Sequence, residues 1–553
     1  MLPNTKSFFL SVGILLFVFY FTSILTPVVW LSLGLSISKS SFIGTIIFTL
    51  ISSVFITKNI YQSPNIQEII TVNITTLIVL LLCGGIANYF FDNTFDGQSY
   101  HYNSIINLVE DWNPIYDFGA ENYYVDNWVI LYYPKASWYS ASNIITFFEN
   151  AKLGKMYNLV LIFATFFMST VIIKENTKLH IVLTIILALS LSFNIISINQ
   201  IFTFYLDGQI SSLIIIVLLS AILYFQKPQK LLFLSVLLGS LVTLVNLKFP
   251  ALVYSVIFGG AFLLFNWHQN GKQHFLRLSM IFGLVFLIGF LGVGFNPYFS
   301  NLFSHGHPFY PLNEVNLLTH ENIPQNFNGV NRFYKLFHSL FSYQGHIVRE
   351  ASTILKSPFS QGLMNTYGLP DTRIGAFGPY FPLVLICSIL ALIPVIIYKE
   401  NKKVKFIAAI ISLAVIISIL IHPESWWGRY IPQLFLLPFL ITIILLISKR
   451  KILKIAGGLL FGLILFNQIN ISISYIKYNL QSTTKLNQQF EKMRTGKTTI
   501  YLCEFPSLAY RLNNESVDFQ IVNTKEDLPC PEAEALHSFP CKAFFCVEKE
   551  EEK

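Results

Sequence analysis

Two aspartates four residues apart mark the first candidate site. Asp92 and Asp96 lie in the stretch 91–101, directly after a long apolar segment at 69–90. Residues four apart share one face of a helix, and a carboxylate within hydrogen-bond reach of a hydroxyl can act as its general base. We therefore expect Asp96 or Asp92 to deprotonate an acceptor. The alternative is that both carboxylates are solvated caps where a helix leaves the membrane.

A second acidic turn repeats the first. The sequence Leu-Asp-Gly-Gln at 206–209 resembles Phe-Asp-Gly-Gln at 95–98. If both turns lie at one membrane face, Asp96 and Asp207 can face a common cleft and share a sugar, an acceptor or a divalent cation. This cation is the candidate cofactor. Because Asp-Gly is an ordinary turn dipeptide, coincidence is the alternative.

Two cations are candidates for binding an anion. Lys248 stands between two apolar segments, and Arg429 begins a later one. Cations held at such positions suggest an anionic ligand, most simply a lipid phosphate, and the planar fork of Arg429 suits phosphate oxygens. For Lys248 the alternative is snorkelling to the interface. Tyr430, next to Arg429, and His101, shortly after Asp96, complete the candidate donor-binding set.

The segments that must position these residues are membrane helices. The chain has 553 residues, of which 54% are hydrophobic and 12% charged, unlike a soluble globular protein. Apolar runs of roughly 20 residues, enough to cross a bilayer, recur along it. We expect an all-α polytopic membrane protein with about thirteen transmembrane helices. They are placed near 8–30, 42–58, 69–90, 156–173, 179–200, 209–226, 231–247, 251–267, 276–295, 379–398, 406–421, 430–448 and 454–475.

The distribution of Lys and Arg gives an orientation, because short cytoplasmic loops collect these residues. With the N-terminus in the cytoplasm, every predicted cytoplasmic loop contains Lys or Arg, whereas the short loops on the other side hold only Lys39, Lys248 and Arg429. The net charge of +8 is mostly this topological signal, and we expect no nucleic-acid partner. The predicted cytoplasmic residues are Lys58, Lys174, Lys178, Lys227, Lys230, Lys272, Arg277, Lys399, Lys402, Lys403, Lys405, Lys449, Arg450, Lys451 and Lys454.

Three larger pieces then lie outside the cytoplasm: a loop at 91–155, a loop at 296–378 and the tail from 476. The first loop contains Trp112, Trp128 and Trp138. Because amphipathic aromatic residues prefer the headgroup layer, we expect this loop to form interfacial helices.

The tail should form a small α/β domain with a disordered, Glu-rich end. It holds four of the six cysteines, Cys503, Cys530, Cys541 and Cys546. An oxidising compartment permits disulfides there, and four cysteines allow three pairings. The sequence does not choose among them.

This constellation resembles the GT-C fold glycosyltransferases, polytopic enzymes that include protein O-mannosyltransferases, aminoarabinose transferases and oligosaccharyltransferase catalytic subunits. In that superfamily an acidic motif opens the first large external loop, as Asp92 and Asp96 do here, and a second acidic site follows, as Asp207 does. The stretch 306–311 and the Arg429–Tyr430 helix start also look like those of bacterial members. The first loop departs from many members in lacking an adjacent Asp-Glu or Glu-Asp pair.

The resemblance implies three parts: two extra N-terminal helices at 1–68, a catalytic membrane module at 69–475 and an extracytoplasmic domain at 476–553. It also implies an inverting transfer of a sugar from a polyprenyl-phosphate donor to a lipid, glycan or protein acceptor. Asp96 or Asp92 would be the base, while Lys248 and Arg429 would bind the carrier phosphate. The expected setting is a bacterial inner membrane, with membrane lipids around the helices.

Two other functions are compatible with a membrane protein of this composition. A flippase or exporter of polyprenyl-linked glycans would place ionisable groups near the bilayer midplane and show repeated halves, whereas here charges cluster at one interface. A glycan polymerase would use Arg-rich external loops. The long loop at 296–378 holds only Arg332, Arg349 and Arg373.

Overall fold

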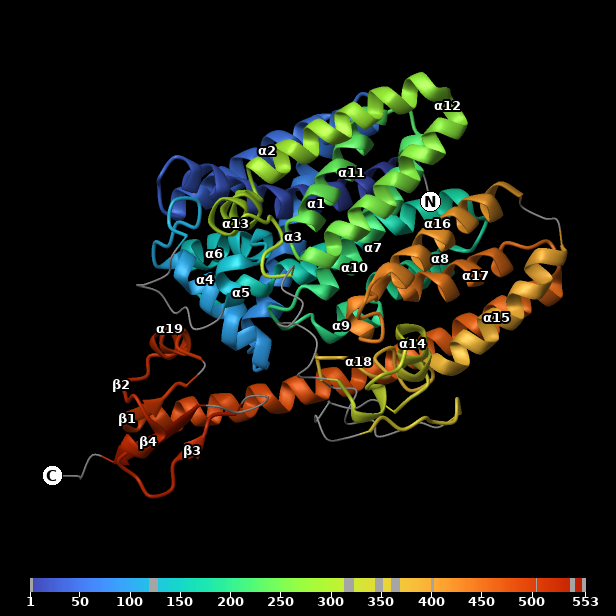
Figure 1. The fold of residues 1–553 in the computed structure, drawn as a ribbon. Helices are drawn as coiled ribbons and strands as arrows, with labels where there is room; N and C mark the ends of the chain where they lie inside the picture. Colours follow the sequence, from blue (N-terminus) through green and yellow to red (C-terminus); the bar gives the residue numbers. More distant parts are fainter. Residues whose placement is uncertain are drawn as a thin grey trace.

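The computed structural model describes residues 3–118, 128–312, 323–343, 352–359, 369–398, 402–503, 505–537 and 543–549. It is mostly helical, with a small sheet near the C-terminus (Figure 1). The longer helices are α1 (Pro3–Ser32), α2 (Lys39–Tyr61), α3 (Ile66–Tyr89), α6 (Ala136–Phe148), α7 (Tyr157–Asn176), α8 (Ile181–Ser192), α10 (Asp207–Gln226), α11 (Lys230–Val245), α12 (Phe249–Leu291), α15 (Phe381–Ile397), α16 (Lys402–Ile421), α17 (Leu436–Leu446) and α18 (Lys451–Arg494). Shorter ones are α4 (Tyr102–Val109), α5 (Trp128–Tyr132), α9 (Ile195–Asn199), α13 (Ser300–His305), α14 (Arg332–Leu340) and α19 (Leu508–Asn514).

Several helices are suited to a bilayer. Within the described residues, eight helices are long and apolar enough to cross a membrane, and four apolar ones are shorter. The predicted count of thirteen spans is therefore not confirmed. The segments expected at 251–267 and 276–295 both lie on α12, whose backbone leaves helical geometry at Gly271, with φ at 82°. Figure 1 shows α12 turning back on itself there, because glycine adopts positive φ at little cost.

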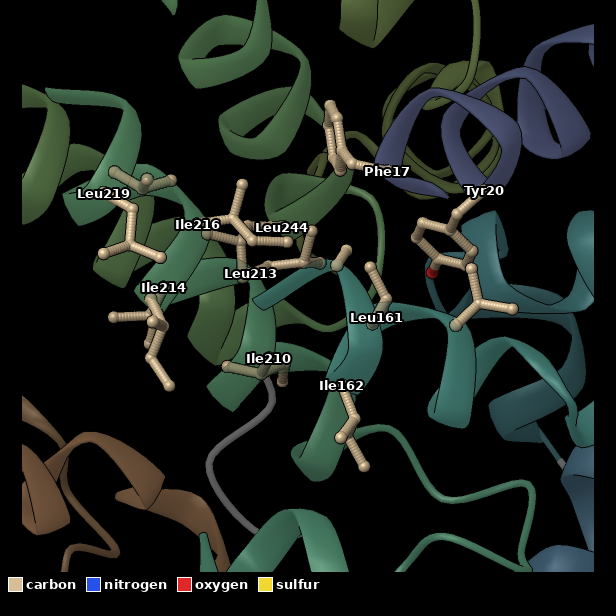
Figure 2. Close-up of a cluster of buried hydrophobic side chains, with 14 of the residues drawn as sticks. Phe17, Tyr20, Leu161, Ile162, Ile210, Leu213, Ile214, Ile216, Leu219 and Leu244 are labelled. Carbon is tan, nitrogen blue, oxygen red and sulfur yellow. The ribbon is translucent and has the colours of Figure 1, made fainter. Parts of the chain in front are cut away.

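The core of the bundle forms where α1, α7, α10 and α11 pack together. Figure 2 shows Phe17 and Tyr20 of α1 among buried aliphatic side chains of the other three helices, such as Leu161, Leu213 and Leu244. The Tyr20 hydroxyl donates a hydrogen bond to Oε1 of Gln209 at 2.8 Å. The first helix is thus an integral part of the core that supports the second Asp-Gly-Gln turn.

Much of the described part of the first large loop is buried within the protein. Trp112 and Trp138 are among the largest fully buried side chains, so their rings contact protein groups, and the interfacial position expected for this loop stays a prediction. The Lys135 ammonium lies over both indole rings, at 5.5 and 5.6 Å from their centroids, and the Nε1–H of Trp138 donates to Nδ1 of His101 at 2.8 Å. Since protein groups satisfy these rings, they do not need the interface.

The C-terminal domain is a four-stranded sheet at the end of α18. The domain boundary predicted at residue 476 lies inside this helix, which continues to Arg494. The strands β1 (Gly496–Tyr501), β2 (Phe519–Ile521), β3 (Glu534–Ala535) and β4 (Phe544–Lys549) are ordered β2-β1-β4-β3. Only β1 and β2 are parallel; β4 runs antiparallel to β1 and β3.

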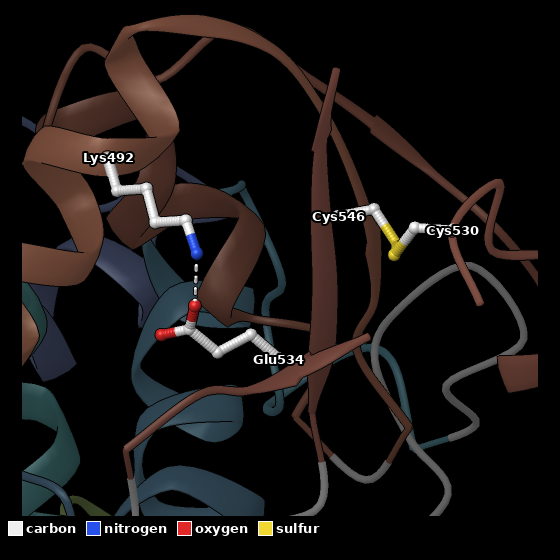
Figure 3. The surroundings of a disulfide bond; sticks show 4 residues. All are labelled: Lys492, Cys530, Glu534 and Cys546. Carbon is white, nitrogen blue, oxygen red and sulfur yellow. Dashed lines mark hydrogen bonds and ion pairs between the residues drawn. A yellow bond between two sulfur atoms is a disulfide. The ribbon is translucent and has the colours of Figure 1, made fainter. Parts of the chain in front are cut away.

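One pair of tail cysteines is joined. Cys530 and Cys546 form a disulfide, and Lys492 of α18 contacts Glu534 at 2.5 Å beside it (Figure 3). Cys503 is free, and Cys541 lies outside the described residues. The bridge therefore links β4 to the segment that precedes β3, a choice that cysteine spacing left open.

Candidate functional site

Arg429 lies between three carboxylates from distant parts of the chain. Its guanidinium is 3.2 Å from Oδ2 of Asp96, 3.7 Å from Oδ2 of Asp207 and 3.1 Å from Oδ1 of Asp371. Only 5% of the Arg429 side chain is exposed. Such a buried cation is tolerated because opposite charges surround it.

Asp207 is the most enclosed of these acids, with 2% of its side chain exposed. It is the first residue of α10, where free N–H groups of the helix favour a negative charge. The Lys248 ammonium donates to its Oδ1 at 2.8 Å, and Gln200 donates to its Oδ2 at 3.1 Å. Because Gln200 also accepts from the Gly208 N–H at 2.8 Å, its amide fixes the second Asp-Gly-Gln turn.

Lys248 directly precedes α12 and completes the cluster. Its ammonium lies 4.3 Å from the centroid of the Tyr430 ring, and the Arg429 guanidinium lies 5.3 Å from the same ring. Tyr430 therefore lies beside both cations. Its backbone carbonyl accepts a hydrogen bond from the Tyr254 hydroxyl, which fixes the single turn Gly428–Tyr430 against α12.

Asp96 is the most accessible carboxylate of the cluster. Its side chain is 16% exposed, and only its Oδ2 lies within hydrogen-bond distance of Arg429, at 3.2 Å. A partly exposed carboxylate beside a buried cation can exchange partners with a ligand. Among the sequence candidates, Asp96 has the geometry most suited to proton transfer.

Asp92 has a different environment from Asp96. Its side chain is buried and accepts hydrogen bonds from the Thr94 N–H at 2.9 Å, the Thr94 hydroxyl at 2.7 Å and the Phe204 N–H at 2.7 Å. Residues 92–94 are not helical, so the expectation that the two aspartates share a helix face is wrong. Asp92 holds the first loop against the segment before α10.

His101 is buried next to Trp138 and lies 6.1 Å, between ring centroids, from Tyr205. Burial lowers the pKa of His101 well below its usual value, and the charges of Lys248 and Arg429 lower it further. The imidazole is therefore neutral near pH 7 and offers no positive charge to a phosphate. Its place is beside the cluster, where its Nδ1 accepts from Trp138.

The sequence analysis missed Asp371 as a site residue and counted Arg373 only as one of the few arginines in the long loop. The Arg373 guanidinium contacts Oδ2 of Asp371 at 2.7 Å and lies 4.3 Å from the Trp427 ring centroid. The Gly428 and Arg429 N–H groups donate to the Arg373 and Thr372 carbonyls at 2.8 and 3.1 Å. An acidic and a cationic residue two positions apart, Asp371 and Arg373, were the available signal in the sequence.

The expected divalent cation between Asp96 and Asp207 does not fit this arrangement, because the Arg429 guanidinium contacts both carboxylates. Over the described ranges, no group of three or more His, Cys, Asp or Glu side chains is placed to hold a metal ion. Arg429 supplies positive charge at the place where a divalent cation was one of the candidates, beside a sugar or an acceptor.

A substitution at Gly428 should displace Arg429. A Cβ at this position would lie 2.2 Å from the Cβ of Ala376, so one of the two segments must shift. We expect Gly428→Ala to cost about 1–3 kcal/mol of stability by overpacking, because the segment that carries the Arg429 guanidinium must move. Thermal unfolding would measure this loss. The control is Gly458→Ala, since a Cβ there meets open space; equal behaviour of the two variants would contradict the prediction.

Burial of His101 predicts acid sensitivity. The unfolded chain takes up a proton at this histidine below about pH 6.5, whereas the folded protein does not, so stability falls as the pH falls below that value. His101→Gln should remove this acid-dependent loss of stability. Melting midpoints between pH 5 and 7.5, with the exposed His274→Gln as control, test it. An unchanged pH profile in His101→Gln would refute the assignment.

Comparisons with known proteins give no assignment. No protein-family model, curated protein or solved structure matches this chain.

Proposed function

We propose that this protein is a membrane glycosyltransferase that moves a sugar from a polyprenyl-phosphate donor to an acceptor hydroxyl at the extracytoplasmic membrane face. The observation that carries the proposal is the meeting of Asp96, Asp207, Lys248 and Arg429 in one cluster. Asp207 begins α10 and Lys248 directly precedes α12, and both helices are candidate membrane spans, so the cluster lies at helix ends rather than at their middles. Charges at one end favour an enzyme over a flippase or exporter.

In the proposed reaction Asp96 accepts the proton of the acceptor hydroxyl. The acceptor oxygen attacks the anomeric carbon, and the bond from that carbon to the phosphate oxygen breaks with inversion. The carrier phosphate leaves with the bonding electrons, and Lys248 and Arg429 stabilise its charge. Removing one such preorganised group from an enclosed site costs about 3–4 kcal/mol of barrier.

The charges of the cluster suggest how the donor activates the base. Asp96, Asp207 and Asp371 balance Lys248, Arg373 and Arg429, so a phosphate adds negative charge to a neutral group. The phosphate then competes with Asp96 for Arg429. Because the Asp96 contact, at 3.2 Å, is the most exposed ion pair of Arg429, it is the one expected to open. Released from the guanidinium, the Asp96 carboxylate is free to accept the proton of the acceptor hydroxyl.

The test is a transfer assay with the purified full-length protein in lipid vesicles. A panel of polyprenyl-phosphate hexoses and pentoses is supplied on the side of the C-terminal domain, and the release of free polyprenyl phosphate is measured together with the new glycoside. Movement of intact donor between leaflets is followed in parallel. Carrier release that depends on Asp96 supports the proposal. Donor movement without carrier release would replace it by the flippase alternative, and joining of two lipid-linked glycans would replace it by the polymerase.

A further inference from the structure

A cleft of about 270 Å³ lies far from the Asp96 cluster, between α10, α12 and α16. α12 packs against both neighbouring helices along this region (Figure 1). Most of the lining is apolar and includes five phenylalanines, contributed by all three helices. The cleft is therefore suited to part of a hydrocarbon chain.

The polar lining is confined to one end of the cleft. Gln226 ends α10, Lys230 begins α11, and Gln269 and Asn270 directly precede the bend of α12 at Gly271. The lining is thus amphipathic, with amides and one cation at the mouth and aliphatic and aromatic side chains behind. This is the distribution of polarity along a phospholipid.

The charge at the mouth is positive and uncompensated. Lys230 is exposed, its ammonium lies 5.6 Å from the Tyr224 ring centroid, and within the described residues it makes no ion pair. The nearby acid Glu175 already contacts Lys227 at 2.7 Å and Lys6 at 3.7 Å. No acidic side chain is among the described residues that line the cleft. Basic pockets between membrane helices attract anionic headgroups.

The cleft and the Asp96 cluster belong to opposite membrane leaflets if α10 crosses the bilayer. Asp207 begins α10 and Gln226 ends it, and its 20 residues span about 30 Å. A lipid bound at the mouth therefore comes from the leaflet that does not contain the proposed sugar donor. This separation makes the cleft independent of the transferase proposal.

We propose that this cleft binds one anionic phospholipid, with its phosphate at Lys230 and part of an acyl chain between α10, α12 and α16. The lipid fills the space that separates α16 from α10. It thereby links α10, which begins at Asp207, to α16, which precedes Arg429 in the chain.

The experiment measures lipid retained by the delipidated full-length protein after exposure to vesicles of phosphatidylglycerol or of phosphatidylcholine with the same acyl chains. Native mass spectrometry should show one phosphatidylglycerol retained in preference to phosphatidylcholine. We expect Lys230→Gln to weaken retention about fivefold, the effect of one basic residue facing an anionic headgroup. The control is Lys178→Gln, which removes the same charge from an exposed position outside the cleft and should retain the lipid.

A second variant tests the chain site separately. Ala261→Phe places an aromatic ring in the cleft and should abolish retention, whereas Val256→Phe adds the ring to an exposed position of the same helix and should not. Equal loss in Lys230→Gln and Lys178→Gln, equal retention of the two lipids, or wild-type retention in Ala261→Phe would each overturn the proposal. None of these results bears on sugar transfer, because no residue varied belongs to the Asp96 cluster.

Discussion

Replacing Asp96 by Asn should lower sugar transfer by about 10²–10⁴-fold, the contribution of a general base, while the protein remains folded. The side chain is partly exposed and its contact with Arg429 is an ion pair at the edge of the cluster, so the isosteric amide should keep the local packing. Turnover with saturating donor and the melting midpoint of the same preparation measure the two quantities. Retained turnover would remove Asp96 from the role of base.

Asp92 provides the matched control, four residues away in the same loop. Its carboxylate accepts three hydrogen bonds from Thr94 and Phe204, so Asp92→Asn should lower stability by about 1–3 kcal/mol because buried donors lose their acceptor. We expect Asp92→Asn to lower the melting midpoint and Asp96→Asn to lower the turnover number. If both variants lost stability and activity in the same proportion, the division of roles between the two aspartates would be wrong.

Replacing Arg429 by Gln should produce the largest combined loss. Asp96, Asp207 and Asp371 would lose their shared cation in a nearly buried cluster, and breaking such an ion pair costs about 3–5 kcal/mol. The proposed phosphate site would also lose its fork of donors. We expect a lower melting midpoint and loss of donor binding, measured by unfolding and by retention of polyprenyl phosphate.

Two further variants separate charge from geometry at this position. Arg429→Lys restores the charge, but a compact ammonium lacks the planar fork that contacts three carboxylates, so stability should recover in part and turnover less. Adding Asp371→Asn to Arg429→Gln removes one of the uncompensated charges and should restore some stability without activity. A double variant no more stable than Arg429→Gln would show that the ion pair with Asp371 does not hold the cluster.

The distribution of residue types was enough to predict the class of the protein and part of the cluster. Apolar runs predicted a helical membrane protein because each run must satisfy its backbone hydrogen bonds internally. The repeated Asp-Gly-Gln turn and the unusual cations Lys248 and Arg429 pointed to residues that do lie together. These signals lie in short stretches of sequence or in the overall composition, so they can be recognised in a single sequence.

Other features depended on contacts between distant segments. Trp112 and Trp138 are of a residue type that is common at membrane interfaces. In this protein, however, the Lys135 ammonium lies over both rings and His101 accepts a hydrogen bond from Trp138. Asp92 and Asp96 are alike in sequence, and only the approach of Phe204 gives one of them a structural role.

By itself the sequence determined that long apolar segments form helices, and it supplied the few ionisable residues at their ends, because hydrophobicity and charge belong to individual residues. Only the tertiary structure decided which of these charges meet. It brought Asp371 to Arg429, placed the guanidinium where a metal ion had been expected, and joined Cys530 to Cys546. The physical reason is that ion pairing acts over a few ångströms in space, and Asp96 and Arg429, which are 333 residues apart, reach that distance only through the packing of the helices between them.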